Sequence, residues 1–158
     1  MEIILEKITE KDKNTLFRLL QYSLFEESAT DLNEMGTDGL FEYKWFDKYF
    51  TDNNYDAFFI KSKYDNKLLG FVMVDTYMQK TDSGHRIAEF MVIPRYRRNK
   101  IGYSAAVKVF DMYSGKWEVS PSYNSHTSYN FWKNVIDRYT DNNNHFEEGI
   151  FIFETKGK

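Results

Sequence analysis

The stretch from Phe90 to Met112 constrains the fold of this 158-residue chain most strongly, because it predicts a strand, a basic loop and a helix in succession. An apolar run from Phe90 to Ile93 stops at Pro94, which can neither donate to a sheet nor continue a helix. From residue 101 onward, apolar side chains recur at the three- and four-residue spacing of a buried helix face. That face consists of Ile101, Ala105, Ala106, Val109, Phe110, Met112 and Tyr113.

The loop between this strand and helix carries a cluster of cations directly ahead of the first helical turn. They are Arg95, Arg97, Arg98 and Lys100. The first N–H groups of a helix lack intrahelical partners, and the positive end of the helix dipole lies there, so a phosphate would gain hydrogen bonds and field energy. A short basic run can also be a solvated loop without a ligand. Its place at a strand-to-helix junction favours an anion site.

This stretch resembles motif A of the GNAT superfamily, the acyl-CoA-dependent N-acyltransferases. The family loop reads Gln/Arg-x-x-Gly-x-Gly/Ala; Arg97 and Gly102 match it, whereas Lys100 replaces the first glycine. The residues ahead of the loop that also match are Val92, Pro94 and Tyr96. A lysine forced into the positive φ that glycine tolerates would cost about 1 kcal/mol of strain. Contact between its ammonium and a phosphate would offset that strain.

The order of predicted elements, β-α-α-β-β-β-α-β-α-β, is similar to the GNAT topology over essentially the whole chain. We therefore expect one GNAT domain over residues 1–158, of α/β (α+β) class. Its central sheet would be mixed and mostly antiparallel, flanked by helices, with one parallel strand pair splayed at the cofactor. The second helix is predicted from Phe41, Trp45 and Tyr49, aromatics at four-residue spacing that would face the core. The last strand is predicted over residues 146–154.

The resemblance implies that acetyl-CoA, the expected co-substrate, lies between residues 90–93 and 117–120. Main-chain groups of residues 90–92 would hold the pantetheine arm, and N–H groups of residues 98–103 would hold the pyrophosphate. The implied cofactor-binding residues are Phe90, Met91, Val92, Arg97, Arg98, Asn99, Lys100, Ile101, Gly102, Tyr103 and Phe131.

Acetyl transfer to an amine requires the neutral amine, and a lysine-like amine of pKa ~10.4 is mostly protonated at pH 7, a deficit of roughly 4–5 kcal/mol. A general base is therefore expected. Glu118 aligns with the base of the similar bacterial ribosomal-protein N-acetyltransferases, and Glu89 lies near the position of the base in other GNAT branches. Each carboxylate could instead be a surface group or half of a structural ion pair.

The acid that protonates the leaving thiolate is expected from a family pattern, Asn-x-x-Ala-x-x-Phe-Tyr. The chain has Ser125-x-x-Ser128-x-x-Phe131-Trp132 at the matching place. An indole N–H is a poor proton donor to a thiolate, so either a group such as Tyr129 substitutes or the thiolate leaves unassisted.

The composition of the chain indicates where the protein would be found and which partners it would have. The chain has no cysteine, which is compatible with a reducing compartment, and lacks both a signal peptide pattern and the ~20 apolar residues that would cross a bilayer. We expect a cytoplasmic protein without a membrane partner. The formal net charge of −3 disfavours nucleic acid as a partner. The histidines, His85, His126 and His145, have no metal-ligand spacing, so no metal is expected and we interpret them as surface or locally hydrogen-bonded residues.

Acidic residues dominate positions 26–52, the segment that borders the acceptor in the resembling family. Asp31, Glu34 and Asp38 are therefore predicted to bind a cationic amine, although acids there could simply keep the protein soluble. The preferred function is acetyl transfer to a primary amine by a monomer or homodimer. The alternatives are a catalytically silent acyl-CoA-binding or partner-binding module of the same fold, and a small nucleic-acid-binding domain using residues 95–100.

Overall fold

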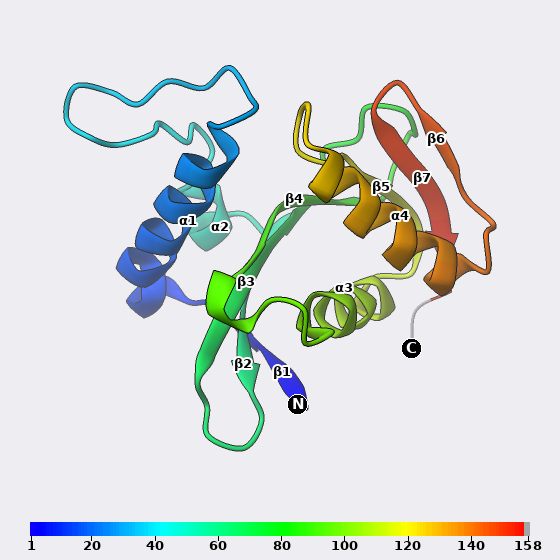
Figure 1. Cartoon of the computed structure of the whole chain (residues 1–158), viewed down its shortest axis with the longest axis horizontal. Helices are drawn as coiled ribbons and strands as arrows, with labels where there is room; N and C mark the ends of the chain where they lie inside the picture. The colour runs from blue at the N-terminus through cyan, green and yellow to red at the C-terminus, as the bar shows by residue number, and fades with distance from the viewer. Residues whose placement is uncertain (157–158) are drawn as a thin grey trace.

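A computed structural model of the chain describes residues 1–156, which form one sheet with helices on both sides (Figure 1). The strands in this part of the chain are β1 (Ile3–Lys7), β2 (Tyr55–Ser62), β3 (Leu68–Asp75), β4 (His85–Val92), β5 (Gly115–Val119), β6 (His145–Glu147) and β7 (Ile150–Thr155). Its helices are α1 (Lys13–Glu27), α2 (Lys48–Thr51), α3 (Ile101–Met112) and α4 (His126–Thr140), with 3₁₀ turns η1 (Glu10–Asp12) and η2 (Pro94–Tyr96).

Within residues 1–156 the strands lie in the order β1-β2-β3-β4-β5-β7-β6. Every neighbouring pair is antiparallel except β4 and β5, which are parallel. A parallel pair needs a crossover connection, and α3 supplies it. The mixed, mostly antiparallel sheet with one parallel pair confirms the predicted α/β fold.

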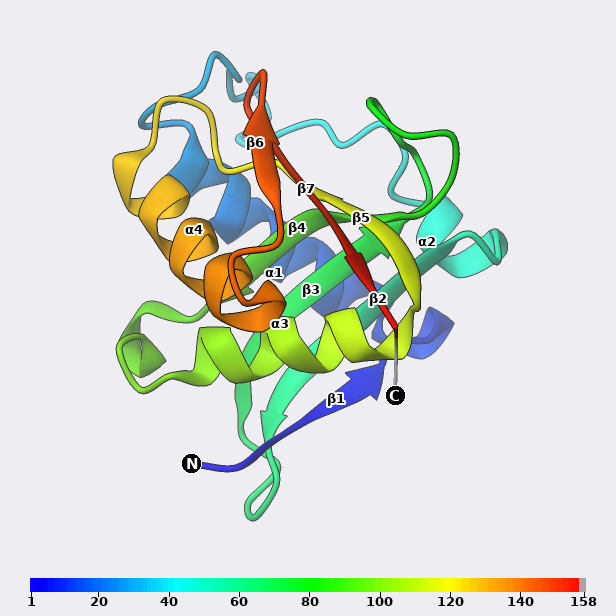
Figure 2. The same cartoon turned by 90° about the vertical axis from the view of Figure 1, so that its right-hand side faces the viewer.

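The helices cover opposite faces of the sheet. In Figure 1, α1 and α2 lie on one side of β3 and β4, whereas α3 and α4 lie on the other; Figure 2 looks onto α3 and α4. Successive side chains of β2 point to opposite faces of the sheet and so contribute to both cores. Phe58 packs in the core under α3 and α4, and Phe59 packs in the core under α1. Strands this apolar on both faces need such a double cover.

The helix predicted after the basic loop is confirmed as α3. Its buried residues are Ile101, Ala105, Ala106, Val109 and Phe110. Met112, which was expected on the same face, is 47% exposed instead, because it is the last residue of the helix, where the covered stripe ends.

The second helix is much shorter than its aromatic spacing predicted. Residues 41–43 have no regular structure, 44–47 form a turn, and only Lys48–Thr51 is helical. The side chain of Gln21, on α1, takes up both main-chain groups of Phe41: its Nε2 donates to the carbonyl and its Oε1 accepts from the N–H, each at 2.8 Å. A helix through Phe41 would give up these bonds. Trp45, expected in the core, is 48% exposed.

The last predicted strand is in fact a hairpin. Glu148 and Gly149 both take positive φ, 49° and 82°, and form a tight turn between β6 and β7. Two successive residues with φ above zero match the twist of a two-residue hairpin turn. The long apolar run around residue 151 concealed this turn in the sequence.

Candidate active site

The parallel strands β4 and β5 pair over a short stretch and then separate. The pairing joins His85–Ile87 to Trp117–Val119. β5 ends there, whereas β4 continues, so Ala88–Val92 have no partner strand on that side among the described residues. A bulge places Ala88 as an extra residue opposite β3, which bends the strand at this point. The main-chain groups of Ala88–Val92 that point toward the β5 side therefore have no strand to pair with.

The basic loop connects this free half of β4 to the N-terminus of α3. Lys100 is the N-cap of α3 with φ of 62°, and Arg98 has φ of 68°. Both have the left-handed backbone that glycine adopts most easily; this was expected at Lys100, which stands where the family has glycine, but not at Arg98. Left-handed residues in such a loop turn neighbouring N–H groups toward one side, which makes an anion-binding concavity.

The backbone donors of this loop are free to serve such an anion. The N–H of Arg97 donates to the carbonyl of Pro94, and that of Ser104 donates to the carbonyl of Lys100. Between them, no backbone N–H of residues 98–103 donates to a main-chain carbonyl in the described part of the chain. The side chains of Arg98 and Lys100 are exposed beside these donors. Geometry and charge at the loop thus fit a pyrophosphate.

Gly102, the matching family glycine, is required by helix packing. A Cβ on it would lie 2.8 Å from Cε1 of Phe131, which belongs to α4. The ring of Phe131 also lies 5.8 Å from that of Phe90 on β4, and Trp132 lies 5.0 Å from Phe90. Aromatic side chains of α4 therefore line the α3 and α4 side of the separating strands.

Arg97 is held by protein groups on two sides. Its Nε donates to the carbonyl of Val92 at 2.7 Å, and its two terminal nitrogens each donate to a carboxylate oxygen of Glu26, on α1, at 2.8 Å. Hydrogen bonding to this guanidinium lowers the pKa of Glu26. The side chain predicted to bind the cofactor thus ties the basic loop to α1.

The remaining residues predicted to bind the cofactor differ in which of their groups are accessible to a ligand. Ile101 is 2% exposed, so only its main chain could reach a ligand. Asn99 Nδ2 donates to the carbonyls of Tyr96 (3.3 Å) and Arg97 (3.4 Å), which braces the loop. The ring of Tyr103 lies under the guanidinium of Arg138 at 4.3 Å.

A groove of about 390 Å³ runs between α1 and the end of β4. Its lining is almost entirely apolar and consists of Leu19, Tyr22, Phe25, Glu26, Met91, Ile93 and Pro94. Met91, predicted to contact the cofactor, thus presents its side chain to the α1 face of the sheet. The Glu26 end of the groove adjoins the basic loop through Arg97.

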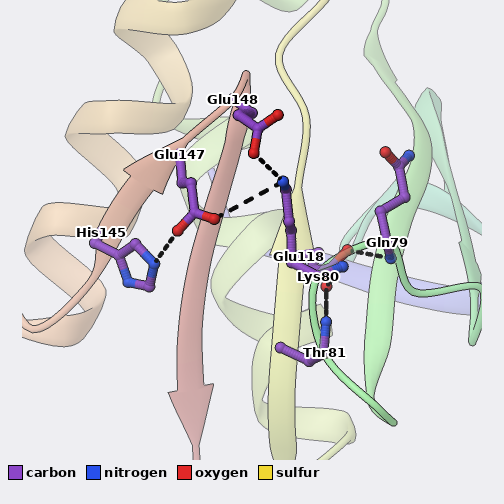
Figure 3. A network of polar contacts seen from close by, with 7 residues as sticks. All are labelled: Gln79, Lys80, Thr81, Glu118, His145, Glu147 and Glu148. Carbon is purple, nitrogen blue, oxygen red and sulfur yellow. Dashed lines mark hydrogen bonds and ion pairs between the residues drawn. The ribbon is translucent and has the colours of Figure 1, made fainter.

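Glu118 lies on β5 with its carboxylate turned into the loop that joins β3 and β4 (Figure 3). It accepts the backbone N–H groups of Gln79, Lys80 and Thr81 at 2.8–2.9 Å, and the Thr81 hydroxyl at 3.2 Å. Burial by itself raises the pKa of Glu118, but these donors outweigh it and the pKa is lowered. A saturated carboxylate of low pKa is a poor base, so the geometry argues against the predicted role of Glu118 and indicates a structural one.

The same loop is tied to the C-terminal hairpin by Lys80. Its ammonium lies 2.5 Å from Glu148 and 3.8 Å from Glu147, so it bridges two carboxylates at the end of β6 (Figure 3). His145 contacts Glu147 at 3.4 Å. Glu118 and Lys80 together hold the β3–β4 loop between β5 and the hairpin.

Glu89 has very different surroundings. It follows the bulge on β4 and interacts electrostatically with Glu27, the last residue of α1. The Tyr43 hydroxyl donates to its Oε2 at 3.4 Å. Burial, and then the neighbouring Glu27, hold the pKa of Glu89 well above its usual range. A carboxyl of raised pKa beside the free half of β4 can act as a base near neutral pH.

Other groups near Glu89 were not expected from the sequence. Asp75, at the end of β3, is 2% exposed and binds Arg86 through Nε at 2.7 Å and Nη2 at 3.0 Å. The Tyr49 hydroxyl donates to the same carboxylate at 3.4 Å. The sequence contains no spacing that links Glu27 or Tyr43 to Glu89, since each comes from a different element of the fold.

The three acids predicted to bind the acceptor lie along the segment between α1 and α2. Asp31 accepts the N–H of Asn33 at 2.9 Å, and Asp38 accepts the N–H of Leu40 at 3.2 Å, so both brace turns. Glu34 lines a polar pocket of about 360 Å³. Burial, and to a lesser extent the charge of Asp31, raise the pKa of Glu27, so Asp31 interacts electrostatically with the end of α1.

Trp132, which replaces the family tyrosine, is buried among Phe90, Phe110 and Phe131. Tyr129 stacks on Phe151 at 5.5 Å, toward β7. The aromatic packing explains why tryptophan fits at residue 132.

His85 corrects the expectation that all the histidines are superficial or locally bonded. It is partly buried against Tyr113 and Trp117, and its Nδ1 has no partner among the described residues. Burial lowers its pKa.

Within residues 1–156 no group of three or more His, Asp or Glu side chains could hold a metal ion. No helix in that range is long and apolar enough to span a membrane.

Known structures share this architecture. A spermidine N-acetyltransferase from Vibrio cholerae, in complex with CoA and spermine, has a TM-score of 0.65 at 10% identity, covering 97% of this chain and 95% of that one. A GNAT-family putative acetyltransferase from Desulfovibrio desulfuricans has a TM-score of 0.63 at 9% identity, covering 97% and 99%. An aminoglycoside acetyltransferase from an uncultured soil metagenomic sample has a TM-score of 0.55 at 15% identity, covering 84% and 86%.

No curated protein matches the chain by sequence. The model of the acetyltransferase (GNAT) family matches residues 21–133, a range that includes the basic loop, both separating strands and the C-terminal part of α1. Sequence and fold agree: the chain belongs to the GNAT acetyltransferase family.

Proposed function

We propose that the protein transfers an acetyl group from acetyl-CoA to a primary amine by direct attack in a ternary complex. The observation that carries this proposal is continuity: the half of β4 that has no partner on its β5 side leads directly into the basic loop and the free N–H groups at the start of α3. Residues 98–103 would hold the pyrophosphate, with Arg98 and Lys100 adding charge. Main-chain groups of Phe90–Val92 would hold the pantetheine arm. The bound thioester supplies the acetyl group.

Glu89 is the better candidate for the base. Its pKa is raised, whereas that of Glu118 is lowered by four donors that already occupy its carboxylate. Glu89 accepts one proton from the ammonium of the acceptor, directly or through a water, and releases the neutral amine. The amine forms the amide bond as the carbon–sulfur bond breaks, and the second proton that it loses goes to the CoA thiolate.

The acceptor is proposed to be cationic. Support comes from the carboxylates beside Glu89 and along residues 26–38, where Glu27 and Asp31 interact. Two of the structural neighbours are named for amine substrates of this kind, spermidine and aminoglycosides. Small polyamines and amino sugars are therefore the first acceptors to test.

The second candidate is a catalytically silent acyl-CoA-binding module of the same fold. The specific observation in its favour is Trp132, buried where the family carries its tyrosine acid, with Tyr129 turned toward β7. Under that alternative, acetyl-CoA would bind but would release no thiol with any amine.

The test is the Glu89→Gln substitution. We expect kcat to fall by about 10²–10⁴ while the Kd for acetyl-CoA stays within twofold, because the base acts on the amine and not on the cofactor. Glu154→Gln, an exposed carboxylate on β7, is the matched control. Full turnover by Glu89→Gln would remove Glu89 as the base.

A further inference from the structure

The bulge at Ala88 decides which face of the sheet carries the side chain of Glu89. Ile87 packs in the core under α3 and α4, so strict alternation along β4 would place Glu89 on that same face. The extra residue shifts the register, and Glu89 instead pairs with Met73 of β3, whose side chain packs in the core under α1. Directly opposite residues share a face, so the carboxyl of Glu89 points to the α1 side.

Tyr43 reaches this carboxyl from the segment between α1 and α2. Its hydroxyl donates to Oε2 of Glu89 at 3.4 Å, a long bond of the kind that tightens at active sites once substrate is bound. Two buried aromatic side chains, Phe41 and Phe46, anchor the chain on either side of Tyr43. Gln21 also binds both main-chain groups of Phe41 at 2.8 Å. A well-anchored backbone therefore presents the hydroxyl to Glu89.

The charged and titratable groups that surround this contact come from α1, α2, β3 and β4. Glu27, at the end of α1, opposes the ionisation of Glu89, whereas Arg86 on β4 favours it. The guanidinium of Arg86 is bound to Asp75 of β3 at 2.7 and 3.0 Å, and the hydroxyl of Tyr49, on α2, donates to the same Asp75. Arg86 thus has its own carboxylate partner and acts on Glu89 through its charge.

The hydroxyl of Tyr43 stays protonated while it contacts Glu89, because burial, and then the charge of Glu89, raise the pKa of Tyr43. A neutral hydroxyl that donates to one carboxylate oxygen restricts the rotation of the carboxylate. It leaves the other oxygen, Oε1, to accept a proton. The donor also favours the ionised form of the carboxylate, which is the form that a base needs.

We propose that Tyr43 is a positioning residue for acetyl transfer: its hydroxyl holds Oε2 of Glu89, so that Oε1 receives the proton of the acceptor ammonium. This assignment rests on the proposed role of Glu89 as the base. In the step, one N–H bond of the ammonium breaks and one O–H bond forms at Oε1, while Tyr43 keeps its own proton. Tyr43 lies on the same segment as the predicted acceptor-binding acids, so the contact connects that segment to the base.

The test is Tyr43→Phe, which keeps the ring and removes the hydroxyl. With the fastest acceptor among spermidine, an amino sugar and a lysine-rich peptide, kcat/KM should fall about five- to twentyfold, while the Kd for acetyl-CoA stays within twofold. The acidic limb of the kcat/KM profile should move to higher pH, because the lost donor favoured the ionised form of Glu89. An unchanged kcat/KM, or a loss of activity with the limb in place, would overturn the proposal.

Tyr49→Phe is the matched control. It removes a hydroxyl-to-carboxylate bond of the same 3.4 Å length, to Asp75, from a buried tyrosine of α2. Its Tm should fall about as much as that of Tyr43→Phe, and its acidic limb should stay in place. The same comparison can be made without an acceptor, by NMR titration of carboxyl-labelled glutamate: the midpoint of Glu89 should rise in Tyr43→Phe and stay unchanged in Tyr49→Phe. An unmoved midpoint in Tyr43→Phe would overturn the contact itself.

A double variant separates this proposal from the assignment of the base. In the Glu89→Gln background, Tyr43→Phe should change kcat/KM by less than twofold, because Tyr43 acts through the carboxylate of Glu89. An equal loss in both backgrounds would show that Tyr43 acts elsewhere and would overturn its positioning role. Full turnover by Glu89→Gln alone would instead defeat the assignment of the base, whatever Tyr43→Phe shows.

Discussion

Arg97 and Glu26 form a bidentate ion pair, with both nitrogen–oxygen distances at 2.8 Å, that ties the basic loop to the end of α1. The carboxylate of Glu26 therefore neutralises one of the cations expected to attract the cofactor. Because the pair is largely exposed, its net contribution to stability should be below about 1 kcal/mol. Its effect should appear in cofactor binding.

Glu26→Gln should bind acetyl-CoA about two- to fivefold more tightly at low salt, because it removes a negative charge beside the pyrophosphate and frees Arg97. Isothermal titration calorimetry at two salt concentrations measures this, and the gain should shrink at high salt. Glu2→Gln, which breaks an exposed ion pair with Lys63, is the control. Weaker binding by Glu26→Gln would show instead that the ion pair holds the loop ready for the cofactor.

Lys100→Gly should leave acetyl-CoA affinity within a few-fold, because it frees a left-handed backbone position while it removes one charge. The same change should stabilise the fold by about 1 kcal/mol, or roughly 2–4 °C in Tm for a chain of this size. Calorimetry and thermal unfolding test both effects. Asn99→Gly, at a neighbouring position without positive φ, should lower Tm. A hundredfold loss of affinity in Lys100→Gly would show that its ammonium dominates.

Glu118→Gln should destabilise the protein by about 2 kcal/mol or more at pH 7, because an amide cannot accept from three N–H groups and a hydroxyl. The folded pKa of Glu118 is lowered, so its contribution is present above the unfolded pKa and is lost as pH falls through the folded value. Denaturant unfolding should therefore show a deficit that disappears in acid. Unchanged stability with abolished turnover would return Glu118 to the role of base.

The strand, basic loop and α3 were predictable because their signals are local: Pro94 ends the strand, and apolar spacing continues from Ile101. The contact between Gln21 and Phe41 was not predictable, since a side chain twenty residues away removes the backbone groups that a helix would need. The aromatic period at Phe41, Trp45 and Tyr49 thus indicated a helix that the tertiary structure prevents.

The candidate site also has one part that the sequence predicts and one part that only the fold reveals. The loop cations could be found by spacing and by resemblance. The choice between Glu89 and Glu118 depends on hydrogen-bond partners that come from the segment between α1 and α2 and from the β3–β4 loop. Such partners are brought together by the fold, so no sequence window contains them.

Combined substitution of Asp31, Glu34 and Asp38 by neutral amides should raise the KM for a cationic acceptor several-fold and leave the KM for acetyl-CoA unchanged. Each exposed charge contributes well under ~1 kcal/mol at physiological salt, so the triple change is needed. Steady-state kinetics with each substrate varied in turn measures the two constants. An unaffected acceptor KM would exclude these acids from acceptor binding.

The most direct test of the central claim is acetyl-CoA-dependent release of free thiol by the full chain, measured with spermidine, an amino sugar and a lysine-rich peptide, and with the acetylated product identified by mass spectrometry. We predict amine-dependent thiol release with at least one cationic acceptor, one acetyl group per thiol, and a loss of at least a hundredfold in Glu89→Gln. Tight acetyl-CoA binding without thiol release for any of these amines would contradict the account and favour the silent binding module.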